Sequence, residues 1–152
     1  MSIRDFVTNP RNFRELNLAI RRALGLRGAP RAARRILLVE EQAWSRKTLS
    51  RVLERAGYEV VVAGGGQQAE AILSLQPVDL VIADVALAHA DGVDLVRRLH
   101  LEHPTVRIVA IASSESAEPD LEAACAVGAV RGVAAPFEGR QLVEAVRDIL
   151  AR

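Results

Sequence analysis

Three acidic side chains follow apolar runs of strand length. Glu40 and Glu41 come directly after the run 35–39, and Asp84 ends the run 79–84. In an open parallel sheet, ligands bind beyond the carboxyl ends of the strands, where the strand order reverses. If these strands are neighbours, three carboxylates converge on one crevice, where they suit Mg²⁺ and where, without a cation, repulsion raises one pKa. The alternative is three solvated carboxylates at loop starts, but their order along the chain favours the site.

Short apolar runs alternate with amphipathic segments from residue 34 onward. The runs of strand length are 35–39, 58–63, 79–84, 106–111 and 130–134, and the helical segments are 43–56, 69–75, 92–101, 119–127 and 142–150. Strands that alternate with helices form parallel βαβ units through right-handed crossovers. Because the strands are apolar on both faces, we expect helices on both sides of the sheet. The sequence therefore predicts an α/β fold with a doubly wound, five-stranded parallel sheet.

The length and composition fit one globular domain with an arm. The chain has 152 residues, of which 50% are apolar and 26% charged, which argues against wholesale disorder. Its single cysteine, Cys125, excludes an internal disulfide and is expected to be a small buried apolar residue. No apolar run reaches the ~18 residues that span a bilayer, and no signal-peptide core is present. We therefore expect a cytoplasmic protein.

The charge is divided unevenly along the chain. Residues 1–35 carry nine arginines against Asp5 and Glu15, a net charge of +7, whereas the remainder has eleven basic and seventeen acidic residues, a net charge of −6. We therefore divide the chain into a basic amphipathic arm with its linker, 1–33, and a domain, 34–152.

Three interpretations of the arm stay open. Its helical stripe resembles the last helix of the domain, so it could be a relic of a preceding domain. It could also dock on a protein partner or on a second copy of this chain through the helix in 1–30, which the stripe favours. A membrane surface is the third and weaker interpretation. Nucleic acid is disfavoured as a partner because the basic run lacks a helix-turn-helix pair.

Six ordered landmarks resemble the receiver domain of bacterial response regulators, over about residues 34–152. The landmarks are Leu37–Glu41, Gly57–Val60, Pro77–Asp84, Asp91-Gly92, Gly128-Ala129 and Pro136-Phe137. The resemblance implies the strand order 2-1-3-4-5 and a place in two-component, or phosphorelay, signal transduction. It also implies that a histidine kinase transfers a phosphoryl group to an aspartate that holds Mg²⁺ together with an acidic pair. By position, Asp84 is the phosphoacceptor, Glu40 and Glu41 are the acidic pair, and the backbone carbonyl of Ala86 is a further metal ligand.

Three positions depart from the pattern of this family, and the sequence is therefore of a degenerate, pseudo-receiver type. Ala112 stands where the family has Thr or Ser, so the hydroxyl that would bind a phosphoryl oxygen is lost. Ala135 stands at the lysine position and removes the protein cation that would neutralise the added negative charge. Gly132 stands at the switch aromatic and offers no ring to reposition.

Other side chains could compensate for these losses or cover the site. Ser113 follows Ala112 by one residue and is a possible substitute, although a shift of one residue turns a side chain to the opposite face of a strand. Lys47 or Arg131 could supply a positive charge. Trp44, at the start of the first helix of the domain, could cover the crevice, but packing against the domain is the favoured interpretation.

The sequence as a whole predicts a signalling module and not an enzyme. We expect an atypical receiver that acts mainly through protein–protein interaction, possesses impaired phosphorylation switching and binds Mg²⁺ weakly. One alternative is a functional Mg²⁺-dependent phosphoacceptor receiver that uses Asp84. Another is a scaffold, or a homodimer, assembled through the N-terminal helix.

Overall fold

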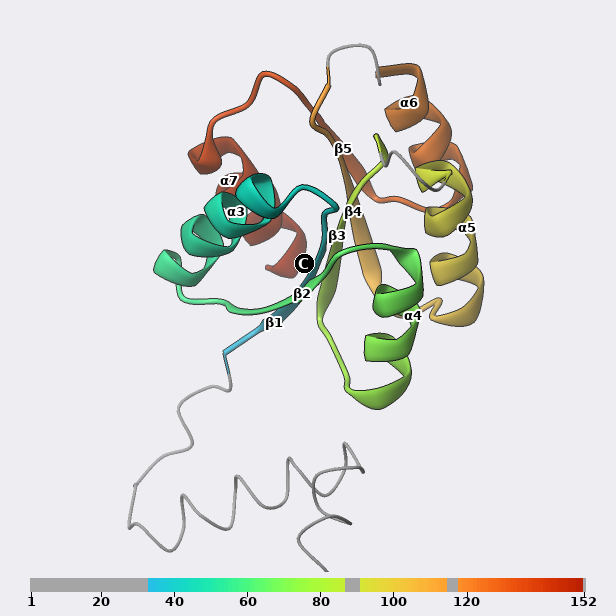
Figure 1. Cartoon of the computed structure of the whole chain (residues 1–152), viewed down its shortest axis with the longest axis horizontal. Helices are drawn as coiled ribbons and strands as arrows, with labels where there is room; N and C mark the ends of the chain where they lie inside the picture. The colour runs from blue at the N-terminus through green and yellow to red at the C-terminus, as the bar shows by residue number, and fades with distance from the viewer. Residues whose placement is uncertain (1–32, 87–90, 115–117, 152) are drawn as a thin grey trace, which may run out of the picture.

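A computed structural model describes residues 33–86, 91–114 and 118–151 of the 152-residue chain. Strands and helices alternate strictly along these residues (Figure 1). The elements are β1 (Arg35–Val39), α3 (Ala43–Arg55), β2 (Glu59–Ala63), α4 (Gly66–Leu75), β3 (Leu80–Asp84), α5 (Gly92–Glu102), β4 (Arg107–Ala112), α6 (Glu118–Val127), β5 (Arg131–Ala134) and α7 (Gly139–Leu150).

The five strands form one parallel sheet in the order β2-β1-β3-β4-β5, which confirms the predicted fold class and strand order. Helices α3 and α7 cover one face, and α4, α5 and α6 cover the other (Figure 1). The chain runs outward from β1 to β2 and then returns to the other side of β1 as β3. The order therefore reverses between β1 and β3, and the ends of these two strands are the expected place for a site.

Each central strand contributes side chains to two separate cores. Along β1, Ile36 and Leu38 belong to the core under α3 and α7, whereas Leu37 and Val39 belong to the core under α4, α5 and α6. Side chains alternate between the faces of a strand, so a strand that is covered on both sides must be apolar throughout. This is why β1 and β3 appear in the sequence as uninterrupted apolar runs.

Two helices begin three residues earlier than their sequence patterns predict. Helix α4 begins at Gly66, so the interpretation of Gly66 as loop is wrong. Helix α7 begins at Gly139, because Glu138 and Gln141 cap it reciprocally, and the Glu138 N–H donates to Oε1 of Gln141 at 2.7 Å. The first turns of both helices carry glycine and polar residues, so the spacing of apolar residues does not reveal where these helices begin.

The remaining predictions for the chain have different outcomes. Cys125 is exposed on α6, so its predicted burial is wrong. No helix in residues 33–86, 91–114 and 118–151 combines the length and the apolar character needed to cross a membrane. The predictions for the arm, including its helix and its resemblance to the end of the domain, fall almost entirely outside the described residues.

Candidate functional site

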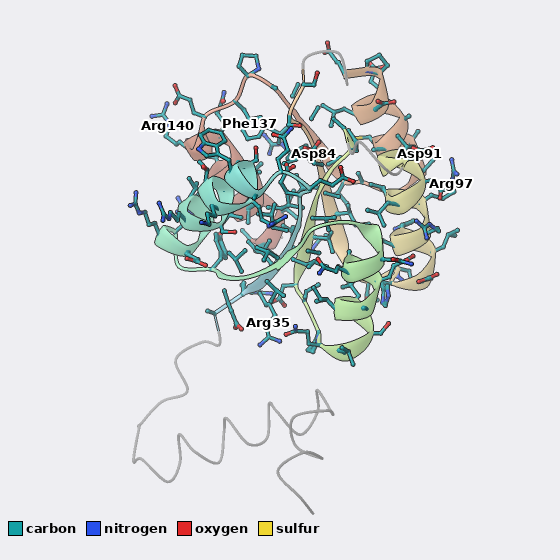
Figure 2. The ribbon with its side chains drawn as sticks, viewed as in Figure 1. Arg35, Asp84, Asp91, Arg97, Phe137 and Arg140 are labelled. Atoms are coloured by element: carbon teal, nitrogen blue, oxygen red, sulfur yellow. The ribbon has the colours of Figure 1, made fainter. Side chains whose placement is uncertain are left out.

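Two buried carboxyl groups lie side by side where the strand order reverses. Val39 of β1 pairs with Ala83 of β3, so the next residues, Glu40 and Asp84, reach the carboxyl edge of the sheet at the same level. Glu40 is 2% exposed and Asp84 1% exposed, and they are the two buried charged residues of the described part of the chain. Figure 2 shows Asp84 at the carboxyl ends of the strands, with Arg35 at their opposite ends. Two acids are thus held together in an apolar surrounding.

The Glu40 carboxyl group is the less favourably solvated and hydrogen-bonded member of this pair. Its Oε1 accepts the backbone N–H of Gln42 at 3.0 Å, whereas its Oε2 is buried without a hydrogen-bond partner among the described residues. The pKa of Glu40 is raised from 4.5 to about 7, chiefly by burial, with smaller contributions from contact with Asp84 and from the charges of Asp84 and Glu41, against the lowering effect of the Gln42 N–H. The predicted rise of one carboxyl pKa is confirmed, but desolvation causes more of it than repulsion does.

Backbone amides hold the Asp84 carboxyl group in place. Its Oδ1 accepts the N–H of Ala86 at 2.9 Å and faces the N–H of Ser113 at 3.4 Å. These donors come from the β3–α5 and β4–α6 connections, so both loops are drawn to one oxygen atom. Backbone N–H groups that converge on a carboxylate can also bind the oxygens of an anionic group attached to it.

Gly92, the first residue of α5, fixes the loop that carries Ala86. A Cβ atom at position 92 would lie 2.5 Å from Cα of Val85, which is closer than any side chain can approach. Glycine therefore lets α5 pack directly against the backbone that follows Asp84. The Asp91 side chain starts the same helix, because its Oδ1 accepts the N–H groups of Val93 and Asp94.

The carboxylate pair has the chemistry of a Mg²⁺ site. Mg²⁺ prefers oxygen ligands and takes one or two carboxylates while it keeps several waters. Glu40 and Asp84 supply two carboxylates, and the unpartnered Oε2 of Glu40 is an oxygen that a cation would satisfy. Within residues 33–86, 91–114 and 118–151, no three acidic, histidine or cysteine side chains form a group that could hold a metal ion. Glu40, Glu41, Asp84 and the Ala86 carbonyl therefore all stay predictions as ligands.

Arg46 is the cation that the structure places against the acidic loop. Its Nη1 donates to the backbone carbonyls of Glu40 at 2.9 Å and Glu41 at 3.3 Å. Sequence reasoning selected Lys47 instead, but Lys47 is exposed on α3. Arg46 and Lys47 are adjacent in the sequence, and only the rotation of the helix decides which of them faces the loop.

The second predicted source of charge, Arg131, lies elsewhere. It begins β5 opposite Val109, below the edge of the sheet, and its Nη1 lies 3.5 Å from Oδ2 of Asp148 on α7. Both groups are exposed, so this pair contributes little to stability. The Arg131 guanidinium group is thus directed away from Asp84 by its position on the strand.

The three positions that depart from the family pattern lie at the end of β4, within β5 and directly after β5. Ala112 ends β4 and is completely buried in the core under α4, α5 and α6. The Ala135 N–H donates to the Ala112 carbonyl at 3.0 Å, and a cis peptide bond joins Ala135 to Pro136. A Cβ atom at Gly132 would lie 3.5 Å from Sγ of Cys125, so a side chain would fit there. These three residues offer no hydroxyl group, aromatic ring or positive charge.

Ser113 and Trp44 lie on the α3 side of the same edge. Ser113 is exposed one residue beyond β4, so only its backbone N–H reaches Asp84. Whether its hydroxyl can substitute for the missing one stays a prediction. Trp44 is 77% exposed, so the packing interpretation is wrong, and its ring contributes to a pocket beside Glu40.

A doubly wound sheet in the order 2-1-3-4-5, with a buried aspartate between two loop amides at the switch point, is the arrangement of a receiver module. A family model described as the response regulator receiver domain matches residues 36–147. The chain belongs to this family.

The curated relatives that the chain matches include transcriptional regulatory proteins of bacteria. The chain is 35% identical over 118 residues to the phosphate regulon transcriptional regulatory protein PhoB of Pseudomonas aeruginosa, which covers 77% of this chain and 52% of that protein. It is 32% identical over 122 residues to the transcriptional regulatory protein PdtaR of Mycobacterium tuberculosis, covering 78% of this chain and 58% of the relative. The chain thus spans about half the length of the curated relatives that it matches.

Solved structures agree with the fold. The receiver domain of the TMAO respiratory system response regulator TorR aligns with a TM-score of 0.72 and 30% identity, over 78% of this chain and 98% of that one. A response regulator from Thermotoga maritima aligns with a TM-score of 0.70 and 26% identity, over 79% and 99% of the two chains.

Proposed function

We propose that this receiver domain of two-component signalling acts mainly through protein–protein interaction, and that phosphorylation of Asp84 is only weakly coupled to its conformation. The observation that carries the proposal is the residue type at three positions on β4, on β5 and directly after β5. Ala112, Gly132 and Ala135 bring no hydroxyl group, movable ring or cation to this end of the sheet.

Electrostatics explains why this set would impair switching. A phosphoryl group on Asp84 adds negative charge beside Glu40, whose carboxyl group is already buried and only half satisfied. Mg²⁺ supplies charge neutralisation when it is bound, but Ala135 contributes none. Gly132 has no side chain that could move between two positions. Few interactions would therefore differ between two conformations of the domain, and phosphorylation would favour the second one only weakly.

The test uses NMR spectra of the full chain with Mg²⁺ and beryllofluoride, which mimics the phosphorylated aspartate. We expect shifts close to Asp84, Ala86 and Ser113, and little change along β5. The matched variant is Ala112→Thr with Ala135→Lys, which adds the missing hydroxyl and cation without altering Asp84. In this variant the shifts should extend into β4 and β5. Large shifts in β4 and β5 of the unmodified chain would overturn the proposal.

A functional phosphoacceptor is the second candidate, and the amides of Ala86 and Ser113 favour it. These donors could hold phosphoryl oxygens without help from any side chain, and the added group would then be lost to water. The chain would receive the group, in our proposal from a histidine kinase, and would not act as an enzyme on a separate substrate. Labelling with radioactive acetyl phosphate that disappears in Asp84→Ala would support this candidate, and no labelling at any Mg²⁺ concentration would eliminate it.

Assembly through the arm is a separate part of the proposal, and it rests on charge. The first 35 residues carry +7 and the remainder −6, so two chains could associate arm to domain. Sedimentation of the full chain against residues 33–152 tests this. We expect a larger species for the full chain at low salt, and equal behaviour of the two proteins would contradict it.

A further inference from the structure

A pocket opens beside Glu40 on the α3 side of the sheet edge. Its volume is about 460 Å³, within the range of sites that hold small organic molecules. It lies between α3, the end of β4 and the β5–α7 connection. Leu49, Val52, Ile111 and Phe137 are among the apolar residues of its wall. Its lining is thus apolar over most of the surface, with a few polar groups.

The carboxyl group of Glu40 is the charged group of this lining. Glu40 is 2% exposed, and its Oε2 has no hydrogen-bond partner in the described part of the chain. A buried carboxylate without a partner is costly, so a donor or a cation placed there would be bound favourably. The pocket therefore combines an apolar volume with a wall that contains a buried, incompletely hydrogen-bonded acid.

The protein itself brings no cation to this pocket within the described residues. Neither Lys nor Arg contributes to the lining, and position 135 contributes only a methyl group. Arg46 is close by in the sequence, but its Nη1 is bound to the backbone carbonyls of Glu40 and Glu41. A positive charge that complements Glu40 would therefore come from outside the described residues.

Trp44 supplies an aromatic surface to the same lining. It is 77% exposed, although it contributes to the pocket together with the half-buried Phe137. An exposed tryptophan next to a buried acid suits a ligand that is both cationic and apolar, because ring faces attract cations and also pack against hydrocarbon.

We propose that this pocket binds an organic cation, namely a primary ammonium group on an apolar body. The ammonium group donates to the Glu40 carboxylate, and the apolar body packs among Leu49, Val52 and Phe137 under the Trp44 ring. The proposal goes beyond the proposed function, because binding needs no phosphoryl group on Asp84.

The single tryptophan of the chain makes the test direct, since Trp44 fluorescence reports on this pocket alone. The probes are phenethylammonium and its neutral analogue 2-phenylethanol, titrated into the full chain in EDTA. We expect a saturable fluorescence change with the amine at a concentration at least about tenfold lower than with the alcohol, which corresponds to about 1.4 kcal/mol.

Two variants test the charge of Glu40 and the volume of the pocket separately. Glu40→Gln should abolish the preference for the amine, and Ala135→Leu, which fills the pocket without charge, should weaken both probes. Glu54→Gln is the matched control, because Glu54 is an exposed glutamate on α3. This variant should bind both probes as the unmodified chain does. Mg²⁺ should compete with the amine for Glu40.

Three outcomes would overturn the proposal: equal binding of amine and alcohol, unchanged preference in Glu40→Gln, or no saturation by either probe. NMR shifts of the Ile111 and Leu49 methyl groups provide a second readout in case the fluorescence of an exposed ring responds weakly. These results are independent of the beryllofluoride experiment, so either proposal can fail alone.

Discussion

The backbone N–H of Ser113 faces Oδ1 of Asp84 at 3.4 Å, although Ser113 itself is exposed one residue beyond β4. A main-chain donor does not depend on which side chain occupies its position. The loss of the hydroxyl group at Ala112 therefore leaves part of the hydrogen bonding around Asp84 intact. No backbone group can replace the positive charge that is missing at Ala135.

The first prediction concerns the pH dependence of stability. The pKa of Glu40 is raised from 4.5 to about 7 in the folded chain, so between these values the folded state binds more protons than the unfolded state. The free energy of unfolding should therefore fall as pH rises through this window, by up to about 3 kcal/mol. Urea denaturation in EDTA across the window measures it.

Glu40→Gln should remove this decrease, because a neutral amide has no proton to lose. Glu54→Gln is its control, since Glu54 is exposed, and it should keep the pH dependence of the unmodified chain. An equal slope in Glu40→Gln and the unmodified chain would show that another group causes it.

The second prediction separates the two causes of the raised pKa. In Asp84→Asn the side chain keeps an oxygen for the Ala86 N–H but loses its charge. The pKa of Glu40 should then fall below about 7 and stay above 4.5, because burial is the largest cause and remains. Carbon-detected NMR of the Glu40 carboxyl group measures it, with exposed Asp148→Asn as the control. No change in Asp84→Asn would contradict the contact.

The third prediction concerns Arg46. Arg46→Ala removes the donor to the carbonyls of Glu40 and Glu41, and it should lower the free energy of unfolding by about 1–3 kcal/mol. Amide hydrogen exchange in the β1–α3 loop should accelerate. Lys47→Ala, one residue away and exposed, should change stability by less than about 0.5 kcal/mol. Equal effects of the two variants would remove the special role of Arg46.

The fourth prediction concerns Gly92. Helix propensity alone predicts that Gly92→Ala gains stability, by up to about 1 kcal/mol. The close approach of Val85 predicts the opposite, a loss of about 1–3 kcal/mol with displacement of the Asp84 loop. Thermal and urea unfolding decide between them. Gly65→Ala is the control, since a Cβ atom there meets nothing within 4 Å, and it should change stability by no more than about 1 kcal/mol.

The sequence predicts the sheet well because buried parallel strands leave a strong signal. The runs that became β1 and β3 are apolar on both faces, so the alternation of strands and helices and the positions of Glu40 and Asp84 could be predicted from the residues. The strand order came from the family resemblance. The starts of α4 and α7 could not be predicted by periodicity, because their first turns are polar or contain glycine.

The details of the site were less accessible for a physical reason. Which of Arg46 and Lys47 reaches the loop depends on the rotation of α3, and the contact of Ser113 with Asp84 is made by the backbone. Neither the rotation of a helix nor a backbone contact can be deduced from the types of residues in the sequence. The place of Trp44 in the pocket lining depends on the three-dimensional arrangement of α3 and the β5–α7 connection, which residue types alone do not give.

The alternation of side chains along β4 divides the edge of the sheet into two compartments. Ala112 belongs to the core under α6 that also meets position 132, whereas Ile111 and Ser113 face the pocket under α3. Mutations in the two compartments share few contacts, so their energies should add. Ala112→Thr would therefore leave the lining residues of the pocket in place, whereas Ala135→Lys would bring a positive charge into the pocket wall, so the two halves of the relay differ in what their restoration does to the pocket.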